Sequence, residues 1–452
     1  MHVEIIQTDE LGDRTYVVHD GTVAVVVDPQ RDIDRVEGVL QNAGVAVALV
    51  LETHIHNDYV TGGHHLSRRA DARYALNAAD PVAFDRVPVR DGDMLEAGSL
   101  RIRVRATPGH TDTHLAYVVT DSAAPAEPPA VFTGGSLLYG SVGRTDLVDP
   151  VRTEELTRAQ YRSVHRLVEG LPDAAQIYPT HGFGSFCSSG STSGRDTGTL
   201  GIERRSNDAF TAPDERTFVA DLVAALTAYP AYYAHMAPRN LGGPEPADLS
   251  APETVEAGEL HRRIDAGEWV VDLRDRVFYA ADHLAGTVGI ALGTQFATYL
   301  GWLAPWESPI TLIGDSPAQV AAAQRQMVRI GIDRPAGAAT GDLDALTAAG
   351  RERRTYPRVG FAALRRVGPD AVLLDVRRDD ERVAGHIAHS VHIPLHHLLS
   401  CLDELPHGTV WVHCASGFRA SIAASLLDRA GRDVTLIDDE YGRAVALGLS
   451  LN

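Results

Sequence analysis

The C-terminal half of the chain contains an internal repeat, and this repeat constrains the fold more than any other feature of the sequence. Residues 269–274 read W-V-V-D-L-R, and residues 372–377 read V-L-L-D-V-R. A histidine follows the aspartate in each copy, and the offset between copies is 103 residues for both the aspartate and the histidine. Each copy therefore has the length of a small domain.

Both copies alternate short apolar runs with helix-compatible stretches. A short apolar segment follows each histidine, at 288–290 or 391–394, and a strand-like run comes later, at 310–313 or 410–412. An Ala-rich stretch compatible with a helix follows that run. Strands that alternate with helices predict a parallel sheet, so we expect two α/β domains with parallel sheets. Their expected bounds are 254–350 and 356–452.

The region before the repeat is long enough for a domain of its own. Several Pro and Gly residues at 238–252 indicate a linker, so residues 1–245 are expected to form the first domain. The apolar runs 23–27 and 45–51 predict buried strands, and the second leads directly into T-H-I-H-N-D-Y. Residues 182–201 are rich in Gly, Ser and Thr and predict a loop that is either flexible or lines a site.

Charge and composition exclude several classes of partner. A formal net charge of −19 repels nucleic acid and anionic membranes. No apolar run approaches the roughly 18 residues that span a bilayer, and the N-terminus lacks the regions of a signal peptide. Three scattered cysteines fit a reducing compartment. We therefore expect a cytoplasmic protein that binds neither nucleic acid nor membranes, and the sequence leaves a homo-oligomer open.

One cysteine lies in a setting that favours chemistry. Residues 410–420 read V-W-V-H-C-A-S-G-F-R-A, so an apolar strand ends at Cys414 and a helix-compatible segment follows. A thiolate there lies over backbone N–H groups and the positive end of a helix dipole. Gly417 lets the backbone curl around the sulfur, and Arg419 adds a positive charge. These features favour a nucleophilic sulfur that carries a persulfide.

The C-x-x-G-x-R loop after a strand, with the upstream D-V-R and G-H-I, resembles the active site of the rhodanese family. The resemblance covers residues 356–452 and implies a sulfurtransferase in which Cys414, Gly417 and Arg419 are catalytic. It further implies a persulfide or thiosulfate as sulfur donor and a thiol as acceptor.

The first copy lacks this chemistry. Asp315 stands where the last copy has its cysteine, and the loop glycine and arginine are missing. Because aspartate cannot carry transferable sulfur, residues 254–350 are interpreted as an inactive rhodanese-like domain. Cys401 lies outside any such loop and is interpreted as a packing residue.

Four histidines of the first domain lie in short motifs, and three of them are expected at strand ends. T-H-I-H-N-D-Y places His54 and His56 directly after a strand, T-P-G-H contributes His110, and Y-P-T-H contributes His181. Imidazoles on loops at strand ends can converge on one ion. The pattern predicts a metal site in this domain.

This pattern, with F-T-G at 132–134 and G-R-T-D-L at 143–147, resembles the metallo-β-lactamase superfamily and, within it, the persulfide dioxygenases. The likeness spans about residues 1–240 and implies an N-terminal αββα sandwich. The whole domain order resembles bacterial persulfide dioxygenase–rhodanese fusions. In that family two His and one Asp hold one Fe²⁺, with open positions for sulfur and O₂. His54 and His110 match the two histidines.

The third ligand of that family is missing, because F-T-G-D has become F-T-G-G with Gly135 in the place of the aspartate. We expect His56 to complete a three-imidazole site for one iron, and zinc is the alternative. Further candidates for the surroundings of the metal or the substrate are Asp58, Tyr59, Arg144, His181 and Cys187. The last of these is either a sulfur acceptor or a packed loop residue.

Three functions stay open at this point. The leading one is persulfide oxidation coupled to sulfane-sulfur transfer through a Cys414 persulfide, which yields sulfite or thiosulfate. The second is a thioester hydrolase of the glyoxalase II type, which needs two metals, although the missing aspartate and Tyr59 argue against it. The third is a metal-free N-terminal binding platform that carries one active sulfurtransferase domain. Metal content per chain distinguishes the three.

Overall fold

The computed structural model describes residues 1–189, 194–347, 350–368 and 371–451. Within these ranges the chain forms two compact units, Met1–Asp248 with Val328–Gly331, and Leu249–Met327 with Ile332–Asn452. Residues 190–193 of the predicted Gly-rich loop lie outside the described residues, as do 348–349, 369–370 and 452 of the two predicted repeat domains. Over the described part of the chain, no helix is long and apolar enough to cross a membrane.

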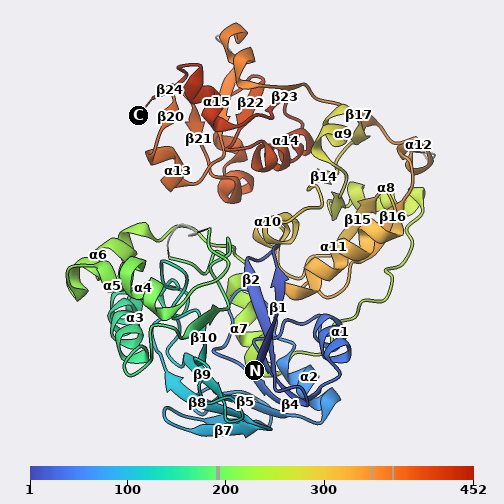
Figure 1. Ribbon diagram of the computed structural model, residues 1–452. Coiled ribbons are helices and arrows are strands. Elements are labelled where there is room, and N and C mark those ends of the chain that lie inside the picture. The colour runs from blue at the N-terminus through green and yellow to red at the C-terminus, as the bar shows by residue number, and fades with distance from the viewer. Residues whose placement is uncertain (190–193, 348–349, 369–370, 452) are drawn as a thin grey trace. The chain divides into compact units, whose positions relative to one another are not determined.

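Two mixed sheets form the centre of the first unit (Figure 1). The six-stranded sheet runs in the order β1 (His2–Thr8), β2 (Asp13–His19), β3 (Val23–Val27), β4 (Ala46–Leu51), β5 (Arg73–Asn77), β6 (Val87–Val89). The five-stranded sheet runs in the order β11 (Gln176–Pro179), β10 (Ala130–Gly134), β9 (Leu115–Asp121), β8 (Leu100–Ala106), β7 (Met94–Ala97). Strands β3 to β6 pair in parallel, as do β10 and β11.

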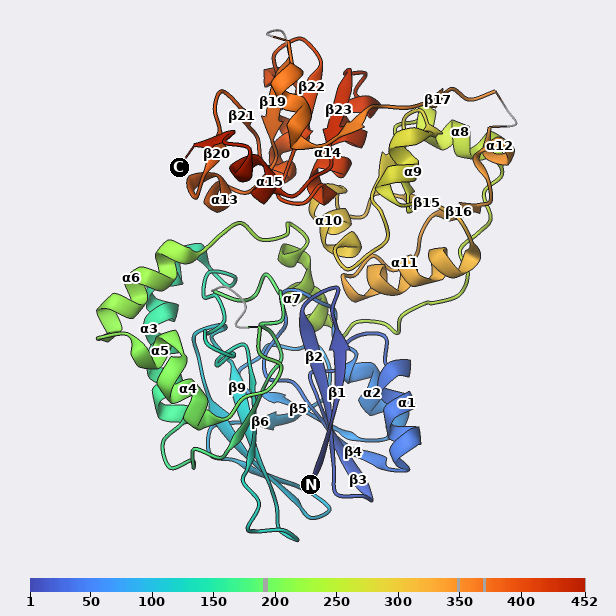
Figure 2. The same cartoon turned by 45° about the horizontal axis from the view of Figure 1, so that its top comes forward.

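Helices cover both outer faces of these sheets. Along β3, Val25 and Val27 enter the core between the sheets, whereas Ala24 and Val26 pack outward, because successive side chains of a strand point to opposite faces. The outward residues pack beneath α1 (Asp34–Ala43) and α2 (Gly63–Ala70). The other sheet is covered by α3 (Thr153–Leu167), α4 (Leu200–Ser206), α5 (Asp208–Thr211) and α6 (Glu215–Ala225) (Figure 2). The predicted αββα sandwich is confirmed.

The second unit contains two parallel sheets. The first has the order β14 (Val288–Gly289), β12 (Trp269–Asp272), β15 (Ile310–Gly314), β16 (Gly337–Thr340). The second has the order β18 (Arg358–Val359), β23 (Val434–Ile437), β22 (Val410–His413), β19 (Val372–Asp375), β21 (Val391–His392). Every strand pair within these two sheets is parallel, as the repeat predicts.

The helices of the second unit alternate with the strands, as expected. A pair of short antiparallel strands also lies in each repeat, outside its parallel sheet. The helices are α8 (Ala257–Asp265), α9 (Arg276–Ala281), α10 (Phe296–Leu303), α11 (Pro317–Arg329), α12 (Leu343–Leu346), α13 (Asp379–Val383), α14 (Phe418–Arg429) and α15 (Tyr441–Ala446). The antiparallel pairs join β13 (His283–Leu284) to β17 (Arg353–Arg354), and β20 (His386–Ile387) to β24 (Ser450–Leu451).

The predicted linker at 238–252 starts later than expected. Helix α7 spans Tyr233–Gly242, so the first five residues of that stretch are helical although Pro238 lies inside the helix. Asn240 of α7 is 1% exposed and bonds to the loop at 56–61. This buried contact outweighs the local signal of proline and glycine.

Candidate metal centre and sulfur-transfer site

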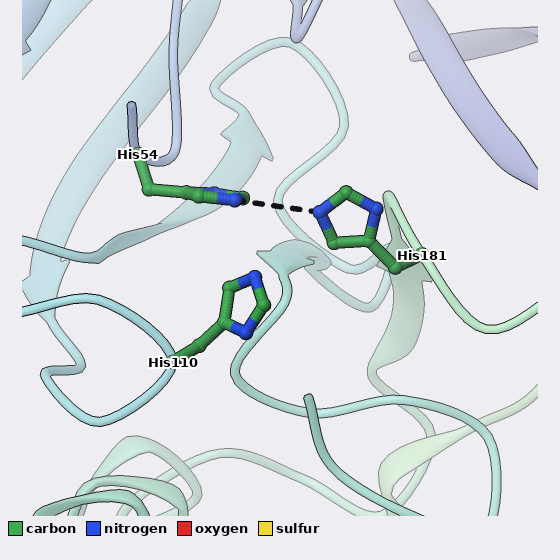
Figure 3. Close-up of side chains that lie close together, drawn as sticks. All are labelled: His54, His110 and His181. Atoms are coloured by element: carbon green, nitrogen blue, oxygen red, sulfur yellow. Dashed lines mark hydrogen bonds between the residues drawn. The ribbon is translucent and has the colours of Figure 1, made fainter. Parts of the chain in front are cut away.

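Three imidazoles converge in the first unit from three separate loops (Figure 3). His54 follows β4, His110 lies between β8 and β9, and His181 follows β11. One ring nitrogen from each lies within 4.8 Å of the others, and His54 Nε2 is 3.3 Å from His181 Nε2. All three side chains are buried, so the sequence brings together a set of nitrogen donors away from water.

His54 and His110 are held as neutral imidazoles. Burial, and then the neighbouring histidines, lower the pKa of His54 well below its usual range, and burial lowers that of His110 to about 3. Their Nδ1 atoms lie 2.9 Å from Thr53 Oγ1 and 2.7 Å from the Arg144 carbonyl oxygen. No described residue bonds to His110 Nε2. A buried acceptor without a partner fits a metal ligand.

Two carboxylates hold the far side of the His181 ring. Nδ1 of His181 lies 2.8 Å from Asp13 Oδ1 and 3.2 Å from Asp58 Oδ2. Burial alone disfavours the charged ring, but the two carboxylates outweigh it and raise the pKa of His181. Carboxylates behind an imidazole orient a metal-ligating histidine, and metal binding at the other nitrogen requires loss of a proton.

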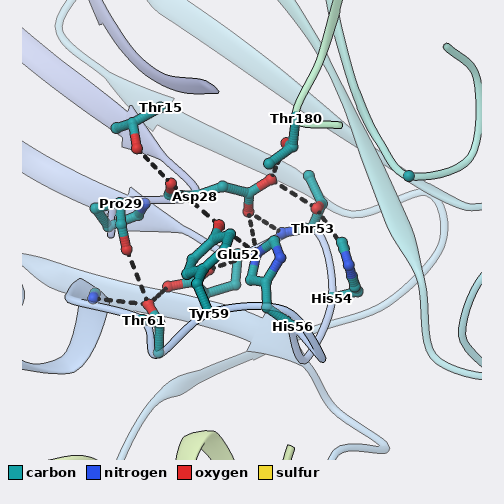
Figure 4. Close-up of polar contacts among 12 residues, drawn as sticks. Thr15, Asp28, Pro29, Glu52, Thr53, His54, His56, Tyr59, Thr61 and Thr180 are labelled. Carbon is teal, nitrogen blue, oxygen red and sulfur yellow. Dashed lines mark hydrogen bonds and ion pairs between the residues drawn. The ribbon is translucent and has the colours of Figure 1, made fainter. Parts of the chain in front are cut away.

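His56, the predicted third ligand, lies in a different network (Figure 4). Its Nε2 is 3.3 Å from both Asp28 Oδ1 and Glu52 Oε2, and 2.9 Å from the Tyr59 hydroxyl. Burial opposes its charge, yet the two carboxylates raise the pKa of His56 to about 9. The ring nitrogens that lie close enough to those of His54 and His110 to bind the same ion are therefore those of His181, not of His56. The ligand role of His56 stays a prediction.

Three nitrogen donors within this range fit one divalent metal, and the set holds no carboxylate like that of the persulfide dioxygenases. The space beside Gly135 is filled by the His110 ring, because a Cβ on Gly135 would overlap it. An aspartate at this position therefore requires the His110 ring to move.

The remaining candidates lie around this centre. Asp58 bonds as described above, and the Tyr59 hydroxyl also donates to the Asp28 carbonyl oxygen at 3.3 Å. The Arg144 guanidinium binds Asp146 at 2.7 and 2.8 Å and lies over the Tyr229 ring. Its backbone carbonyl oxygen accepts from the His110 ring, and the predicted site role of Arg144 stays a prediction. Cys187 is buried with Sγ 3.9 Å from the Tyr233 hydroxyl, and burial raises the pKa of its thiol. This disfavours the thiolate that a sulfur acceptor needs.

A cavity of about 490 Å³ borders the loop that carries His54. Its wall includes Ile55, Asn57, Thr111, Tyr229 and Tyr233. Ile55 lies between His54 and His56 in the chain, and Thr111 directly follows His110. The cavity mixes apolar, aromatic and polar side chains, as small-molecule sites do.

Several residues that shape this centre were missed by sequence reasoning. They are Asp13, Asp28, Glu52, His114 and Asn240. Asp28 directly follows the predicted strand 23–27 and Glu52 directly precedes the histidine motif, so both have a recognisable position in the sequence. Asp13 and Asn240 belong to distant segments, and no local pattern marks them.

In the second unit, Cys414 follows the last residue of β22 and is 1% exposed. Gly417, with φ +88°, caps α14, and its N–H donates to Cys414 Sγ at 3.2 Å. A Cβ on Gly417 would overlap the Asp438 carboxylate, so both the backbone conformation and the space require glycine. The loop thus presents a backbone donor to the sulfur.

Arg419, the third predicted catalytic residue of this loop, makes a two-pronged ion pair with Glu381 of α13 at 2.5 and 2.7 Å. The pair holds the guanidinium in one orientation beside the loop. In the other repeat, Asp315 is exposed and its N–H donates to Gln319 Oε1 at 2.7 Å. Cys401 is half-buried between two short 3₁₀ turns.

Comparison with known proteins is consistent with two kinds of domain. A family model described as a rhodanese-like domain matches residues 362–442. Among solved structures, a metallo-β-lactamase from Staphylococcus aureus subsp. aureus COL superposes with a TM-score of 0.67 at 26% identity, covering 75% of this chain and 99% of that one.

Two groups of curated proteins are similar in sequence. The mitochondrial persulfide dioxygenase ETHE1 of Homo sapiens is 28% identical over 177 residues, which is 39% of this chain and 63% of that protein. A hydroxyacylglutathione hydrolase of Prochlorococcus marinus is 32% identical over 164 residues, which is 36% of this chain and 60% of that protein. The chain thus spans less than two thirds of the length of each of these relatives.

Proposed function

Because the chain joins a metallo-β-lactamase fold, with persulfide dioxygenases among its relatives, to a C-terminal rhodanese domain, we propose that it is an enzyme of persulfide metabolism. In this proposal the first domain oxidises a low-molecular-weight persulfide, and Cys414 transfers sulfane sulfur to sulfite or a thiol. The observation that carries it is the Gly417 N–H that donates to Cys414 Sγ at 3.2 Å.

At Cys414 the chain's own residues account for transfer. The thiolate attacks the outer sulfur of a donor, and the backbone donors of the loop stabilise the persulfide that forms. Sulfite then attacks that outer sulfur, thiosulfate leaves, and the electron pair of the broken S–S bond returns to Cys414 as thiolate. Residues 254–350 carry no nucleophile in this scheme and form the inactive domain.

In the first domain, His54, His110 and His181 would hold one metal, with Asp13 and Asp58 behind the last ring. Iron held there would supply the oxidation of a persulfide by dioxygen to sulfite, whereas zinc would supply Lewis-acid chemistry only. The cavity beside Ile55 and Tyr233 is the proposed binding place of the substrate's thiol carrier.

A hydrolase is the second candidate. Similarity to a hydroxyacylglutathione hydrolase favours it, and so does a second donor group formed by His56, Asp58 and His181. It requires two metals per chain. The network of His56 with Asp28 and Glu52 opposes it, because a second metal must displace those contacts.

Metal analysis of anaerobically purified protein tests the first domain. We expect at most one metal per chain, and we expect His110→Ala to abolish it because the remaining donors are too few. His165→Ala is the matched control, since among the described residues that ring bonds to the Ala209 carbonyl oxygen and packs against Tyr161 and Phe210, outside the centre. Two tightly bound metals would support the hydrolase instead.

The coupled reaction is tested by supplying glutathione persulfide and O₂ to iron-loaded protein. We expect oxygen uptake with thiosulfate as product, and we expect Cys414→Ser to keep the uptake but release sulfite. If the iron-loaded wild type consumes no oxygen, the dioxygenase assignment is wrong and only sulfur transfer remains.

A further inference from the structure

Helix α10 of the first repeat packs against the Cys414 loop of the last repeat, inside the second unit. The ring of Tyr299 on α10 lies 5.8 Å from that of Phe418, which stands between Gly417 and Arg419 in the sequence. One turn later on the same helix, Trp302 stacks on His396 with ring centroids 4.8 Å apart. A domain without a nucleophile of its own therefore places the Tyr299 ring at its neighbour's sulfur-site loop, and its Trp302 ring against another segment of the same neighbour.

No described residue hydrogen-bonds to the Tyr299 hydroxyl; the side chain is 4% exposed, but its oxygen is not fully enclosed. Burial raises its pKa to about 12, with Arg419, Arg378, Cys414 and Glu381 as the charged groups that act on it. The phenol therefore stays protonated at neutral pH and lies within electrostatic reach of the Cys414 sulfur. An unpaired hydroxyl at the open edge of a buried ring is available to donate a hydrogen bond to a ligand atom.

The positive side chains near Cys414 are already paired with carboxylates, so a ligand anion there has use for a further hydrogen-bond donor such as the Tyr299 hydroxyl. Arg419 is paired with Glu381, and Arg378 with Asp380 at 3.0 Å, so each positive charge already faces a carboxylate. The loop supplies a backbone N–H to the cysteine sulfur itself. An incoming anion needs a further donor for its own oxygens, because the guanidinium groups are partly occupied.

Resting on the sulfurtransferase function proposed above, we infer that Tyr299 is a positioning residue for a small sulfur oxyanion at Cys414. The Cys414 thiolate attacks the outer sulfur of thiosulfate, a new S–S bond forms, the S–S bond of thiosulfate breaks, and sulfite leaves with its electron pair. The Tyr299 hydroxyl donates a hydrogen bond to an oxygen of thiosulfate and of the departing sulfite. This role gives a reason for the presence of the inactive repeat.

The test replaces only the hydroxyl, in Tyr299→Phe. We expect kcat/KM for thiosulfate to fall about tenfold or more, mainly through a higher KM, because a hydrogen bond to a charged group is lost. Inhibition by added sulfite should weaken by a similar factor, which a merely structural role does not predict. Transfer from an uncharged organic trisulfide donor should change little.

Tyr279→Phe is the matched control, since its hydroxyl donates to the Thr287 carbonyl oxygen within the first repeat. It should leave the KM for thiosulfate and the inhibition by sulfite unchanged. Binding of thiosulfate and of sulfite to Cys414→Ser protein, with and without Tyr299→Phe, is measured by calorimetry in parallel. This arm works without turnover, so a failure of the sulfurtransferase function is distinguished from a failure of the Tyr299 role. Unchanged binding and unchanged kcat/KM in Tyr299→Phe overturn the inference.

Discussion

The two repeats of the second unit each build a parallel sheet around the same central strand pair, but the loop after one of these strands differs between them. Both place a strand ending in aspartate beside the strand that precedes the loop, and in both an arginine two residues after the aspartate folds back onto it, as Arg274 on Asp272 and Arg377 on Asp375. The loops after β15 and β22 are different. The strand pair and its Asp–Arg contact therefore form with or without a nucleophilic loop. Sulfur transfer depends on the few residues between the strand and the following helix.

The loops after β15 and β22 differ first in length. After β15 only Asp315 and Ser316 precede α11, whereas after β22 the four residues 414–417 precede α14. The longer loop has room to curl, and Gly417 supplies the left-handed backbone that directs its N–H to the sulfur. The shorter loop is closed by the Gln319 side chain instead.

The largest expected effect is on sulfur transfer, which should depend on the loop after β22 and not on the loop after β15. Cys414→Ser should abolish sulfur transfer from thiosulfate, because the hydroxyl cannot form a persulfide, whereas Asp315→Ala should leave the rate unchanged. Intact-mass measurement after incubation with the donor should show one added sulfur in the wild type and none in Cys414→Ser. Full transfer by the serine variant contradicts the assignment of the nucleophile.

A smaller effect is expected from the loop glycine. Gly417→Ala must adopt a positive φ and overlap Asp438, so we expect it to lower the free energy of unfolding by about 2–4 kcal/mol and to reduce transfer. Gly293→Ala in the first repeat is the control, since a Cβ there meets no atom within 4 Å. Denaturant unfolding measures the free energy of unfolding of the two variants. Equal stability of Gly417→Ala and Gly293→Ala argues against a strained loop.

The smallest effect concerns the contact between the repeats. Arg276 of the first repeat binds Asp438 at 2.8 Å, and Arg358 binds the same carboxylate at 2.9 Å. Because Asp438 keeps one partner, Arg276→Met should lower the free energy of unfolding by no more than about 1 kcal/mol. Arg262→Met, an exposed side chain that bonds to Glu259 on its own helix and lies 3.9 Å from Glu268, should change it less. Thermal unfolding of both variants checks the difference.

Much of the fold follows from local patterns in the sequence. The runs at 23–27, 310–313 and 410–412 are strands, because their continuous apolar residues fit sheets that are buried on both faces. The repeat offset gave the two parallel sheets of the second unit. The linker begins later than predicted because the signal of Pro238 is local, whereas the contacts of Asn240 are tertiary.

The candidate metal centre was less accessible to sequence reasoning. Spacing identified His54, His110 and His181, but it did not indicate which ring nitrogens face one another. His56 lies two residues from His54, yet its ring belongs to a network with Asp28 and Glu52, and a one-dimensional pattern does not contain that contact. The residues around Cys414 were easier to predict from the sequence, because one continuous segment supplies most of the loop.

The contacts of Asn240 have a consequence for the motions of the first unit. Its amide donates to the carbonyl oxygens of His56 and Tyr59 and accepts from the Thr61 N–H, all at 2.9 Å. Opening the loop breaks these three bonds together, so loop and helix α7 form one cooperative unit of local unfolding. Exchange of a bound ion through this loop would then proceed at the opening rate of the helix rather than at the rate of a free loop.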